Sequence, residues 1–553
     1  MAEGPSRRIK TLTLVACILG SGIALLDGTV VNVALPTIQR ALGGGLAAQQ
    51  WVVNGYLLTL GSLILVGGSL GDLFGERRIF TIGVVGFGIA SLGCALAPTI
   101  GVLVALRAVQ GIASALLTPA SLAVIVNTFP ESERGAAIGA WTAWGTIAAV
   151  LGPLLGGELL AIASWRWIFL INIPFVAACV ALILTAIPPM AARERPERRV
   201  DVPGGILCAA GLGGTVFALI EQPRLGWSSP GVIGALAGGG ALLALFVLYE
   251  ARARDPMLPL RLFRRRNFSA GNVETFAMYA GLSILFFFLV LFLQQIGGYS
   301  PLESGLATLP VTVVMFFLAR RFGMLADRYG PRLFMGAGPL VCAAGLLLFQ
   351  RVGVHVDYLG AVLPAQLVFA LGLSMTVAPL TAAVLADATH EDAGIASGVN
   401  NAIARVAGLL GTAAVGAAVS ASFVSRLDAR LAHTQLGAAG HAAVQSAKRL
   451  PLGLPDVHSL PPAQAHAVRA AAQAASLHSF HVGMLIAAVL LAVGGAAGVL
   501  GIRNTRGEVD AEDCGPGQLV GTGRQITERH DCEERERVAA GLEGREAAAE
   551  AGG

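Results

Sequence analysis

The sequence predicts an all-α polytopic membrane protein with fourteen transmembrane helices, arranged as two six-helix repeats plus two inserted helices. Three observations predict this fold. Only 13% of the 553 residues are charged and 55% are apolar, whereas soluble domains carry about 25% charged residues. Fourteen apolar stretches are long enough to cross a bilayer, and one ten-residue pattern occurs twice. This composition argues against a soluble enzyme, a secreted disulfide scaffold and a nucleic-acid-binding protein.

The fourteen spans are identified by apolar windows of about 19 residues. We expect them near residues 11–34, 49–70, 79–97, 101–124, 138–160, 167–188, 203–221, 231–250, 268–296, 302–322, 333–352, 358–385, 396–424 and 480–502. The first span begins like a signal peptide, after three basic residues. It is too long for one and lacks a small-residue cleavage site, so we interpret it as an uncleaved span.

Basic residues in the short connections predict the orientation of the spans. Arginine and lysine are concentrated in alternate connections, at residues 7–10, 77–78, 134, 193–199, 252–266 and 328–332. We therefore expect these connections, and both termini, in the cytoplasm. The connection at 425–479 is long and rich in alanine, and we expect it to be external and partly helical. Residues 503–553 carry 7 arginines and 12 acidic residues, and we expect them to form a polar cytoplasmic tail.

The duplicated pattern divides the chain. Its frame is G-x-L-[GA]-D-x-[FY]-G-x-R, and it begins at Gly68 and again at Gly323. The two copies follow the second and the tenth spans, so the spans at 203–221 and 231–250 belong to neither half. We expect a six-helix bundle at 1–190, a linker with two extra helices at 191–266, a second bundle at 267–502 and a tail at 503–553. Parallel repeats of this kind place a site at their interface, near the middle of the membrane.

Several longer motifs then indicate a family. They are LDGTVVNVALP at 26–36, WVVNGY at 51–56, the pattern at 68–78, RAVQG at 107–111, GPLLGG at 152–157, WRWIFLINIP at 165–174 and YSPLESGL at 299–306. On these motifs the sequence resembles the major facilitator superfamily and, within it, the fourteen-helix drug:proton antiporter family. The resemblance extends from about residue 25 to residue 416.

Three charged residues are candidates for proton coupling, because charges inside a membrane are costly and usually functional. Asp27 and Arg107 each lie about six residues from the outer end of their span, roughly 9 Å below the membrane surface, and could form a pair. The resemblance supports proton exchange by Asp27 under the control of Arg107; a static salt bridge is the alternative. Glu274 could bind a second proton or a cationic drug, or it could pair with arginines at the interface.

Polar side chains within the spans are candidates to line a substrate cavity. These residues are Asn32, Asn54, Gln110, Glu274, Asn401 and Arg405. For Arg405 and the neighbouring asparagines, a place in the bundle interior and ordinary interhelical hydrogen bonding are equally supported. Tyr279 is five residues beyond Glu274, about 140° around the helix, so we do not expect it to share the site of Glu274.

Two further sets of residues are expected to control conformation. The resemblance implies a cytoplasmic latch that stabilises the outward-open state, formed by Gly68, Asp72, Gly75, Arg77, Arg78, Asp327, Gly330 and Arg332. Asp72 is expected to cap the helix that follows it and to pair with Arg77 or Arg78. The resemblance also implies an antiporter motif in the fifth span, formed by Gly145, Gly152, Pro153, Gly156 and Gly157. These small residues and the proline favour close packing and a bend.

The functional prediction is a proton-coupled secondary active exporter in a bacterial cytoplasmic membrane. It would exchange protons for hydrophobic or cationic compounds by alternating access. The sequence contains no GxxxxGK[ST] phosphate loop and no Cys or His spacing typical of metal sites, so we expect a proton gradient and no cofactor. The expected partners are a small-molecule substrate, protons and lipid, with no nucleic acid, and the expected state is a monomer. A dedicated exporter of one metabolite or self-made antibiotic is the main alternative; a membrane enzyme or receptor fits less well.

Overall fold

The computed structural model describes residues 6–187, 200–386 and 393–504. Over these residues the chain is helical without β-strands, and fourteen helical segments are long and apolar enough to cross a membrane. The predicted number of spans is therefore confirmed. The arginines at 193–199 and almost all of the predicted tail at 503–553 lie outside the described residues, as do the boundaries predicted at 190 and 191.

The first six spans form one bundle. They are α1 (Arg7–Leu42), α2 (Leu46–Phe74), α3 (Glu76–Leu96), α4 (Ile100–Thr128), α5 (Glu131–Ile162) and the broken pair α6 (Trp167–Leu170) and α7 (Asn172–Ala186). Helix α4 packs against α2 and α3, and α1 packs against α5 and α7. Part of the hydrophobic core of this first bundle surrounds the buried rings of Phe80 and Phe87.

The last six spans form a second bundle. They are α10 (Arg266–Gln295), α11 (Pro301–Tyr329), α12 (Pro331–Leu348), α13 (Leu363–Ala386), α14 (Ala393–Leu431) and α16 (Pro462–Gly501). A 3-10 turn, η2 (Phe349–Arg351), and a π turn, η3 (Tyr358–Val362), lie between α12 and α13. Helix α10 is the most enclosed span and contacts α13, α14 and α16.

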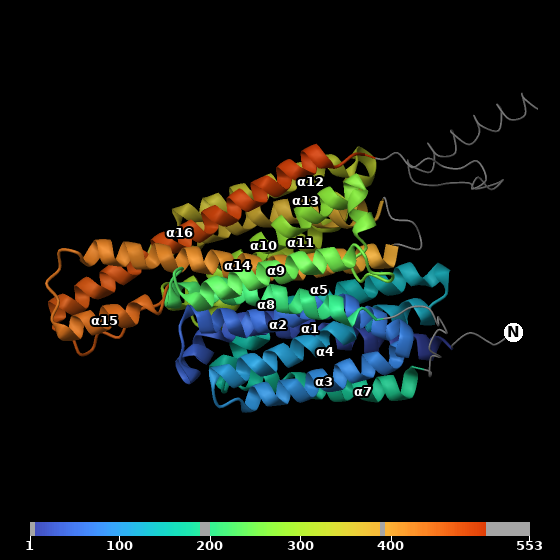
Figure 1. Ribbon diagram of the computed structural model, residues 1–553, viewed down its shortest axis with the longest axis horizontal. Helices are drawn as coiled ribbons and strands as arrows, with labels where there is room; N and C mark the ends of the chain where they lie inside the picture. Colours follow the sequence, from blue (N-terminus) through green and yellow to red (C-terminus); the bar gives the residue numbers. More distant parts are fainter. Residues whose placement is uncertain (1–5, 188–199, 387–392, 505–553) are drawn as a thin grey trace, which may run out of the picture.

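The two inserted helices, α8 (Val202–Leu225) and α9 (Pro230–Glu250), pack against each other. Helix α8 also contacts α2 and α14, one helix from each bundle. Figure 1 shows the first bundle in blue and teal, the second in yellow to red, and the inserted pair in green between them. A short 3-10 helix, η1 (Leu260–Arg264), leads from the inserted pair into α10.

Both copies of the duplicated pattern form the same tight turn. Gly75 ends α2 with φ of 90°, and Gly330 ends α11 with φ of 85°; glycine adopts this left-handed region without steric cost. The expectation that Asp72 caps α3 is wrong, because the cap residue is Gly75 and no side chain bonds there. Asp72 still lies inside α2, and a capping residue needs a non-helical backbone.

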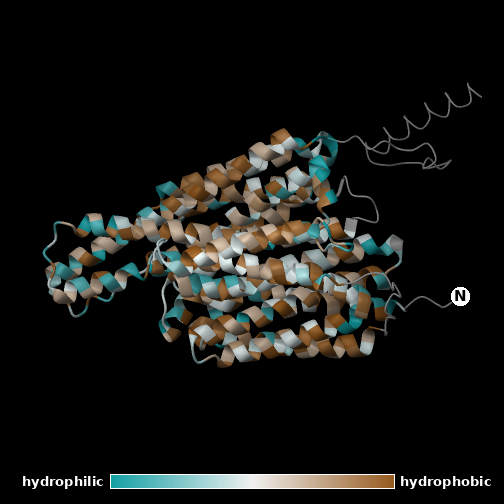
Figure 2. Ribbon diagram, viewed as in Figure 1, coloured by the Kyte–Doolittle hydropathy of each residue, from teal (hydrophilic) through white to brown (hydrophobic). Residues whose placement is uncertain are grey.

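The expected external connection at 425–479 is helical over much of its length. Helix α14 has 39 residues and α16 has 40, so each is about 60 Å long, twice the ~30 Å hydrocarbon thickness. Together with α15 (Ala438–Lys448) their ends form a projecting hairpin (Figure 1) with its own small core around Phe423, Leu427 and Val468. Hydrophilic residues are frequent on this hairpin (Figure 2). Hydropathy alone therefore placed the end of α14 too early and the start of α16 too late.

Candidate functional site

A cavity of about 1890 Å³ lies between the two bundles. We call the side of the molecule on which α1 begins the N-terminal side, and the side that carries the projecting hairpin the α15 side (Figure 1). The cavity is lined by α1, α2, α4 and α5 of the first bundle and by α10, α11, α13 and α14 of the second. Its lining reaches the N-terminal side at the turn after α2 and at the connection between α9 and η1.

Contacts between the bundles close the cavity on the α15 side. The Gln294 side-chain amide on α10 donates to the Val33 carbonyl on α1 at 2.9 Å. The Gln50 amide on α2 donates to the Thr412 carbonyl on α14 at 2.5 Å, and the Thr412 hydroxyl donates to Asn54 at 3.0 Å. The cavity is therefore accessible from the N-terminal side and sealed toward the α15 side.

Helix α5 contributes to the same closure through its small residues. A Cβ atom at Gly157 would lie 2.5 Å from the Cα atom of Leu302 on α11, so only glycine allows this approach. Gly152 and Gly156 approach Thr29 and Val30 of α1 in the same way. Gly145 and Pro153 line the cavity. The predicted motif on α5 thus lies where α5 contacts both α1 and α11.

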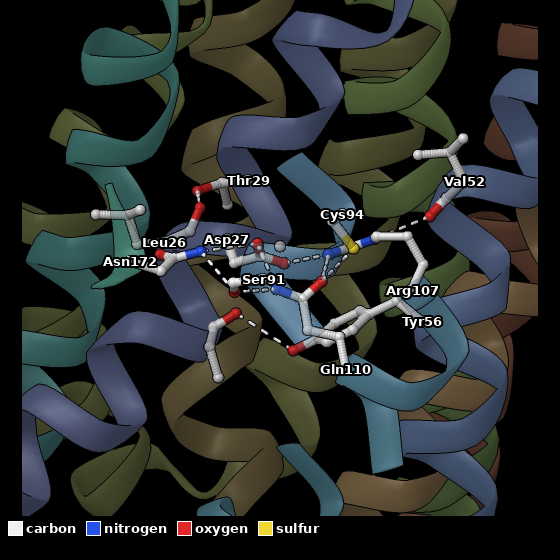
Figure 3. Close-up of polar contacts among 12 residues, drawn as sticks. Leu26, Asp27, Thr29, Val52, Tyr56, Ser91, Cys94, Arg107, Gln110 and Asn172 are labelled. Carbon is white, nitrogen blue, oxygen red and sulfur yellow. Dashed lines mark hydrogen bonds and ion pairs between the residues drawn. The ribbon is translucent and has the colours of Figure 1, made fainter. Parts of the chain in front are cut away.

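A fully buried polar cluster lies beside the cavity in the first bundle (Figure 3). The predicted pairing of Asp27 with Arg107 is present: the Arg107 Nη1 donates to Asp27 Oδ2. The Arg107 Nε donates to the Val52 carbonyl at 3.1 Å, and the guanidinium lies 4.4 Å above the Tyr56 ring. Arg107 lines the cavity and Asp27 lies behind it.

Three further residues complete this cluster. The Gln110 amide nitrogen donates to Asp27 Oδ1 at 3.1 Å and to the Ser91 hydroxyl at 2.7 Å. The Asn172 amide donates to the same Asp27 oxygen at 3.2 Å and to Ser91 at 3.3 Å. The carboxylate of Asp27 therefore connects α1 to α4 and α7 (Figure 3). An ionised carboxylate can be buried here because charged and neutral donors surround it.

The end of α1 differs from the expected end of the apolar span. Helix α1 continues to Leu42, well beyond the apolar span expected to end at 34, and includes Pro36 and polar residues that lower the mean hydropathy. The depth of Asp27 and Arg107 below the membrane surface stays a prediction. Proline is tolerated there when neighbouring helices compensate for its missing N–H.

Only part of the predicted cavity set lines the cavity in this conformation. The residues of this set that line it are Asn32, Asn401 and Arg405. Gln110 belongs to the buried cluster, and Asn54 accepts the hydrogen bond from Thr412. Tyr279, which the sequence separated from Glu274, lines the cavity, and Glu274 does not.

Glu274 lies inside the second bundle. It is fully buried, and neither carboxyl oxygen has a hydrogen-bond partner among the described residues. Its side chain faces Gly498 on α16, where a Cβ would lie 2.8 Å from one oxygen. The expectation that it faces a cavity or pairs with interfacial arginines is therefore not met here, because its face of α10 packs against α16. This pocket can accommodate the neutral acid, whereas an ionised carboxylate would need a partner.

Sequence reasoning assigned no role to three residues of the site: Ser91, Asn172 and Tyr56. Asn172 and Tyr56 lie in the motifs at 165–174 and 51–56, which gave a signal that they matter but not what they contact. Ser91 is one hydroxyl in an apolar span, and nothing in the sequence separates it from the other serines. Its role emerges only when α3 is placed against α4 and α7.

The predicted latch residues lie on the N-terminal side. Asp72 is solvent-exposed at the edge of the cavity, and Asp327 is exposed at the end of α11. Arg77 donates to the Leu184 carbonyl at 3.3 Å, and Arg332 donates to the Val499 carbonyl at 2.8 Å. Both arginines therefore bind the carboxyl end of the last helix of their own bundle. Gly68 lies within α2, and Arg78 is exposed. Among the described residues, no three His, Cys, Asp or Glu side chains are grouped to hold a metal ion.

Comparison with known proteins identifies the family that this chain matches. The family model of the Major Facilitator Superfamily matches residues 17–412. The puromycin resistance protein of Streptomyces alboniger is 38% identical over 74% of this chain and 82% of its own length. The tetracenomycin C resistance and export protein of Streptomyces glaucescens is 36% identical over 73% and 75%. The multidrug resistance protein Stp of Mycobacterium tuberculosis is 34% identical over 77% and 78%.

Solved structures share the fold at low sequence identity. A bacterial homologue of the human lysosomal transporter Spinster aligns with a TM-score of 0.60 and 18% identity, over 90% of this chain and 99% of that protein. A D-xylose-proton symporter aligns with a TM-score of 0.53 and 16% identity, over 88% and 97%. These likenesses support the arrangement of the helices.

Proposed function

The chain belongs to the Major Facilitator Superfamily of membrane transporters, and from this premise we propose that it is a proton-coupled exporter of hydrophobic small molecules. The observation that carries this proposal is the buried pair of Asp27 and Arg107 at the wall of the cavity. A titratable carboxyl group beside the transport path is what a proton-coupled carrier requires. Relatives named for resistance and export support the export direction.

In the proposed mechanism, Asp27 carries the proton and Arg107 controls its release. While Arg107 and the amides of Gln110 and Asn172 bind the carboxylate, the charge is compensated and α1 is held against α4 and α7. Protonation would remove the charge and weaken these charge-assisted bonds. The contact between helices would loosen with it, which couples proton binding to movement of α1. Glu274, buried without a partner among the described residues, is a second candidate proton carrier in the other bundle.

We further propose that the N-terminal side faces the cytoplasm of a bacterial cell, with both termini inside and residues 1–190 and 267–502 moving as two bundles. Short connections rich in arginine lie on this side, as the positive-inside rule requires. The cavity would then be open to the cytoplasm and ready to bind substrate. The positions of Asp72 near the end of α2 and of Asp327 near the end of α11, both on this side, fit a cytoplasmic latch. The chain would act as a monomer, without an enzymatic activity or a cofactor.

A narrower substrate range is a second candidate. Two of the relatives are named for resistance to one antibiotic, puromycin or tetracenomycin C. An exporter dedicated to one metabolite or self-made antibiotic would have the same proton chemistry. Screening a panel of unrelated compounds separates the two: protection against a single structural class supports the dedicated exporter.

The test of the proposed function uses Asp27→Asn in a host that lacks its own efflux pumps. We expect wild-type export of a fluorescent apolar dye to stop when an uncoupler collapses the proton gradient. We expect the variant, which cannot exchange a proton, to export at least about tenfold more slowly when the rate is normalised to the amount of folded protein in the membrane. Exchange of internal for external dye, which needs no net proton transfer, should continue.

The matched control is Asp428→Asn. Asp428 pairs with Lys448 on the surface of the projecting hairpin, where an exposed ion pair contributes only about 0–1 kcal/mol. This variant should export normally. Export by Asp27→Asn at the wild-type rate, or wild-type export that survives the uncoupler, would contradict the proposal.

A further inference from the structure

A positive charge without a partner among the described residues faces the middle of the cavity. Arg405 lies on α14, about halfway between the start of the cavity lining at Gly394 and its end at Thr412. Its guanidinium makes no hydrogen bond and no ion pair with the described part of the chain. We propose that Arg405 binds an acidic group of the substrate, so that the transported compounds are organic anions with an apolar frame. This inference rests on the proposed export function and names its substrate class.

The surroundings of Arg405 place its charge in the cavity. Its Cβ lies beside Gly61 on α2, where an added Cβ would be 3.2 Å away, so the stem of the side chain packs at the junction of the two bundles. Tyr56 and Tyr279 line the same cavity as Arg405. These neutral phenols do not neutralise a guanidinium. The Tyr56 hydroxyl already donates to the Ala24 carbonyl at 3.3 Å, so Tyr279 is the phenol whose hydroxyl can donate to a bound anion.

The other charged groups that line the cavity do not compensate Arg405. Among the described residues, the acids of the lining all lie at the N-terminal rim: Asp72, Glu76, Asp201, Glu250 and Asp255. Asp27, the deep acid, is already paired with Arg107 and lies behind it. Glu274 faces α16 rather than the cavity. The deep part of the cavity is therefore positive, and a cationic substrate would meet no carboxylate of the described residues there.

Physical chemistry favours an anion at this position. An unpaired charge in a partly desolvated site is costly, and a bound carboxylate or acidic phenol removes that cost. Arginine matches a carboxylate with two parallel hydrogen bonds, which fixes orientation as well as charge. Apolar side chains also contribute to the cavity walls, with Met278, Leu282 and Phe286 of α10 in the lining. An acidic group on an aromatic or aliphatic frame satisfies both features.

The test measures binding rather than export, with two probes that differ only in charge. The purified full-length protein in lipid nanodiscs is titrated with 1-pyrenebutyrate, an acid, and with 1-pyrenebutanol, its neutral counterpart, by fluorescence anisotropy. We expect the wild type to bind the acid about tenfold or more tightly than the alcohol. Arg405→Gln should lose this preference while its affinity for the alcohol stays the same. Arg405→Lys should restore part of it.

Two controls show whether the preference for the acid depends on the charge of Arg405 itself. Arg351→Gln removes an exposed arginine on the α15 side and should leave the preference for the acid unchanged. Cationic 1-pyrenemethylamine should bind the wild type more weakly than the alcohol does, and Arg405→Gln should reduce that difference. Equal binding of acid and alcohol by the wild type, no binding of the acid, or a preference that survives Arg405→Gln would overturn the inference. Because binding needs no proton gradient, a failure of proton-driven export would leave this result intact.

Discussion

The carboxylate of Asp27 is the single group on which the first bundle's buried polar contacts converge. Its two oxygens accept from Arg107, Gln110 and Asn172, and all four residues are almost completely buried. Breaking one partner of a buried ion pair typically costs about 3–5 kcal/mol. A change in the charge of Asp27 is therefore large enough to shift the balance between two arrangements of the helices, which few other side chains in this bundle could do.

Glu274 differs from Asp27 because its carboxyl group has no partner to lose among the described residues. We predict that Glu274→Gln folds normally, with a change in the free energy of unfolding of less than about 1 kcal/mol, since neither oxygen makes a hydrogen bond there. If Glu274 carries a proton during transport, the same variant exports more slowly against a gradient, by about tenfold, yet still exchanges substrate. Thermal unfolding in detergent and paired export and exchange assays measure the two effects.

Two comparisons make the Glu274 result interpretable. Glu274→Lys places a permanent charge in the same apolar pocket and should destabilise the protein by several kcal/mol. Thr275→Val, at the next position, removes a hydroxyl that bonds to Asn400 and should leave coupling unchanged. Normal export by Glu274→Gln would remove Glu274 from the proton pathway and leave Asp27 as the remaining candidate.

At the scale of elements, α5 helps to close the α15 side of the cavity through its contacts with α1 and α11. Its glycines bring its backbone against α1 and α11, and Gly157 allows the closest approach to α11. We predict that Gly157→Ala forces α5 and α11 apart, because its Cβ would lie 2.5 Å from the Leu302 Cα atom. Overpacking of this kind costs about 1–3 kcal/mol, or roughly a 5–150-fold shift against the closed state.

The measurement for Gly157→Ala is the reactivity of a cysteine in the cavity. Asn32→Cys, near the sealed end, should react faster with a membrane-impermeant maleimide applied from the α15 side when Gly157 is alanine. Gly139→Ala is the matched control on the same helix, because a Cβ there meets nothing within 4 Å. Equal labelling of Gly157→Ala and Gly139→Ala would show that α5 does not hold this side closed.

The elements also show what could be predicted from the sequence. Hydropathy identified all fourteen spans, since about 20 apolar residues are a strong signal. It missed the ends of α1, α14 and α16, because these helices continue outside the apolar stretch, where helix propensity and packing decide. The pairing of Asp27 with Arg107 could be predicted from charge and depth. The direction in which the Glu274 side chain points could not be predicted. Helix α10 is apolar on nearly every face, so its periodicity does not show which side packs against α16.

At the scale of the whole molecule, the duplicated pattern predicted the two bundles but not which side of the cavity is open. The repeat predicts two similar bundles that can rock against each other, so that the cavity can open on either side. Which side is open depends on a few contacts between bundles, such as the pair of Gln50 and Thr412. No local sequence feature encodes that choice, because both conformations use the same helices.

A disulfide between α2 and α14 should lock the molecule in the conformation in which the α15 side is sealed. Gln50 on α2 and Gly416 on α14 are in direct contact, since a Cβ at Gly416 would meet the end of the Gln50 side chain. Gln50→Cys and Gly416→Cys, in a background without the seven native cysteines, should form a disulfide across the sealed side. Transport by alternating access requires these helices to separate, so oxidation should reduce export about tenfold or more, and a reductant should restore it. Each single variant under the same oxidant is the control. Normal export by the fully cross-linked protein would mean that the α15 side need not open between α2 and α14.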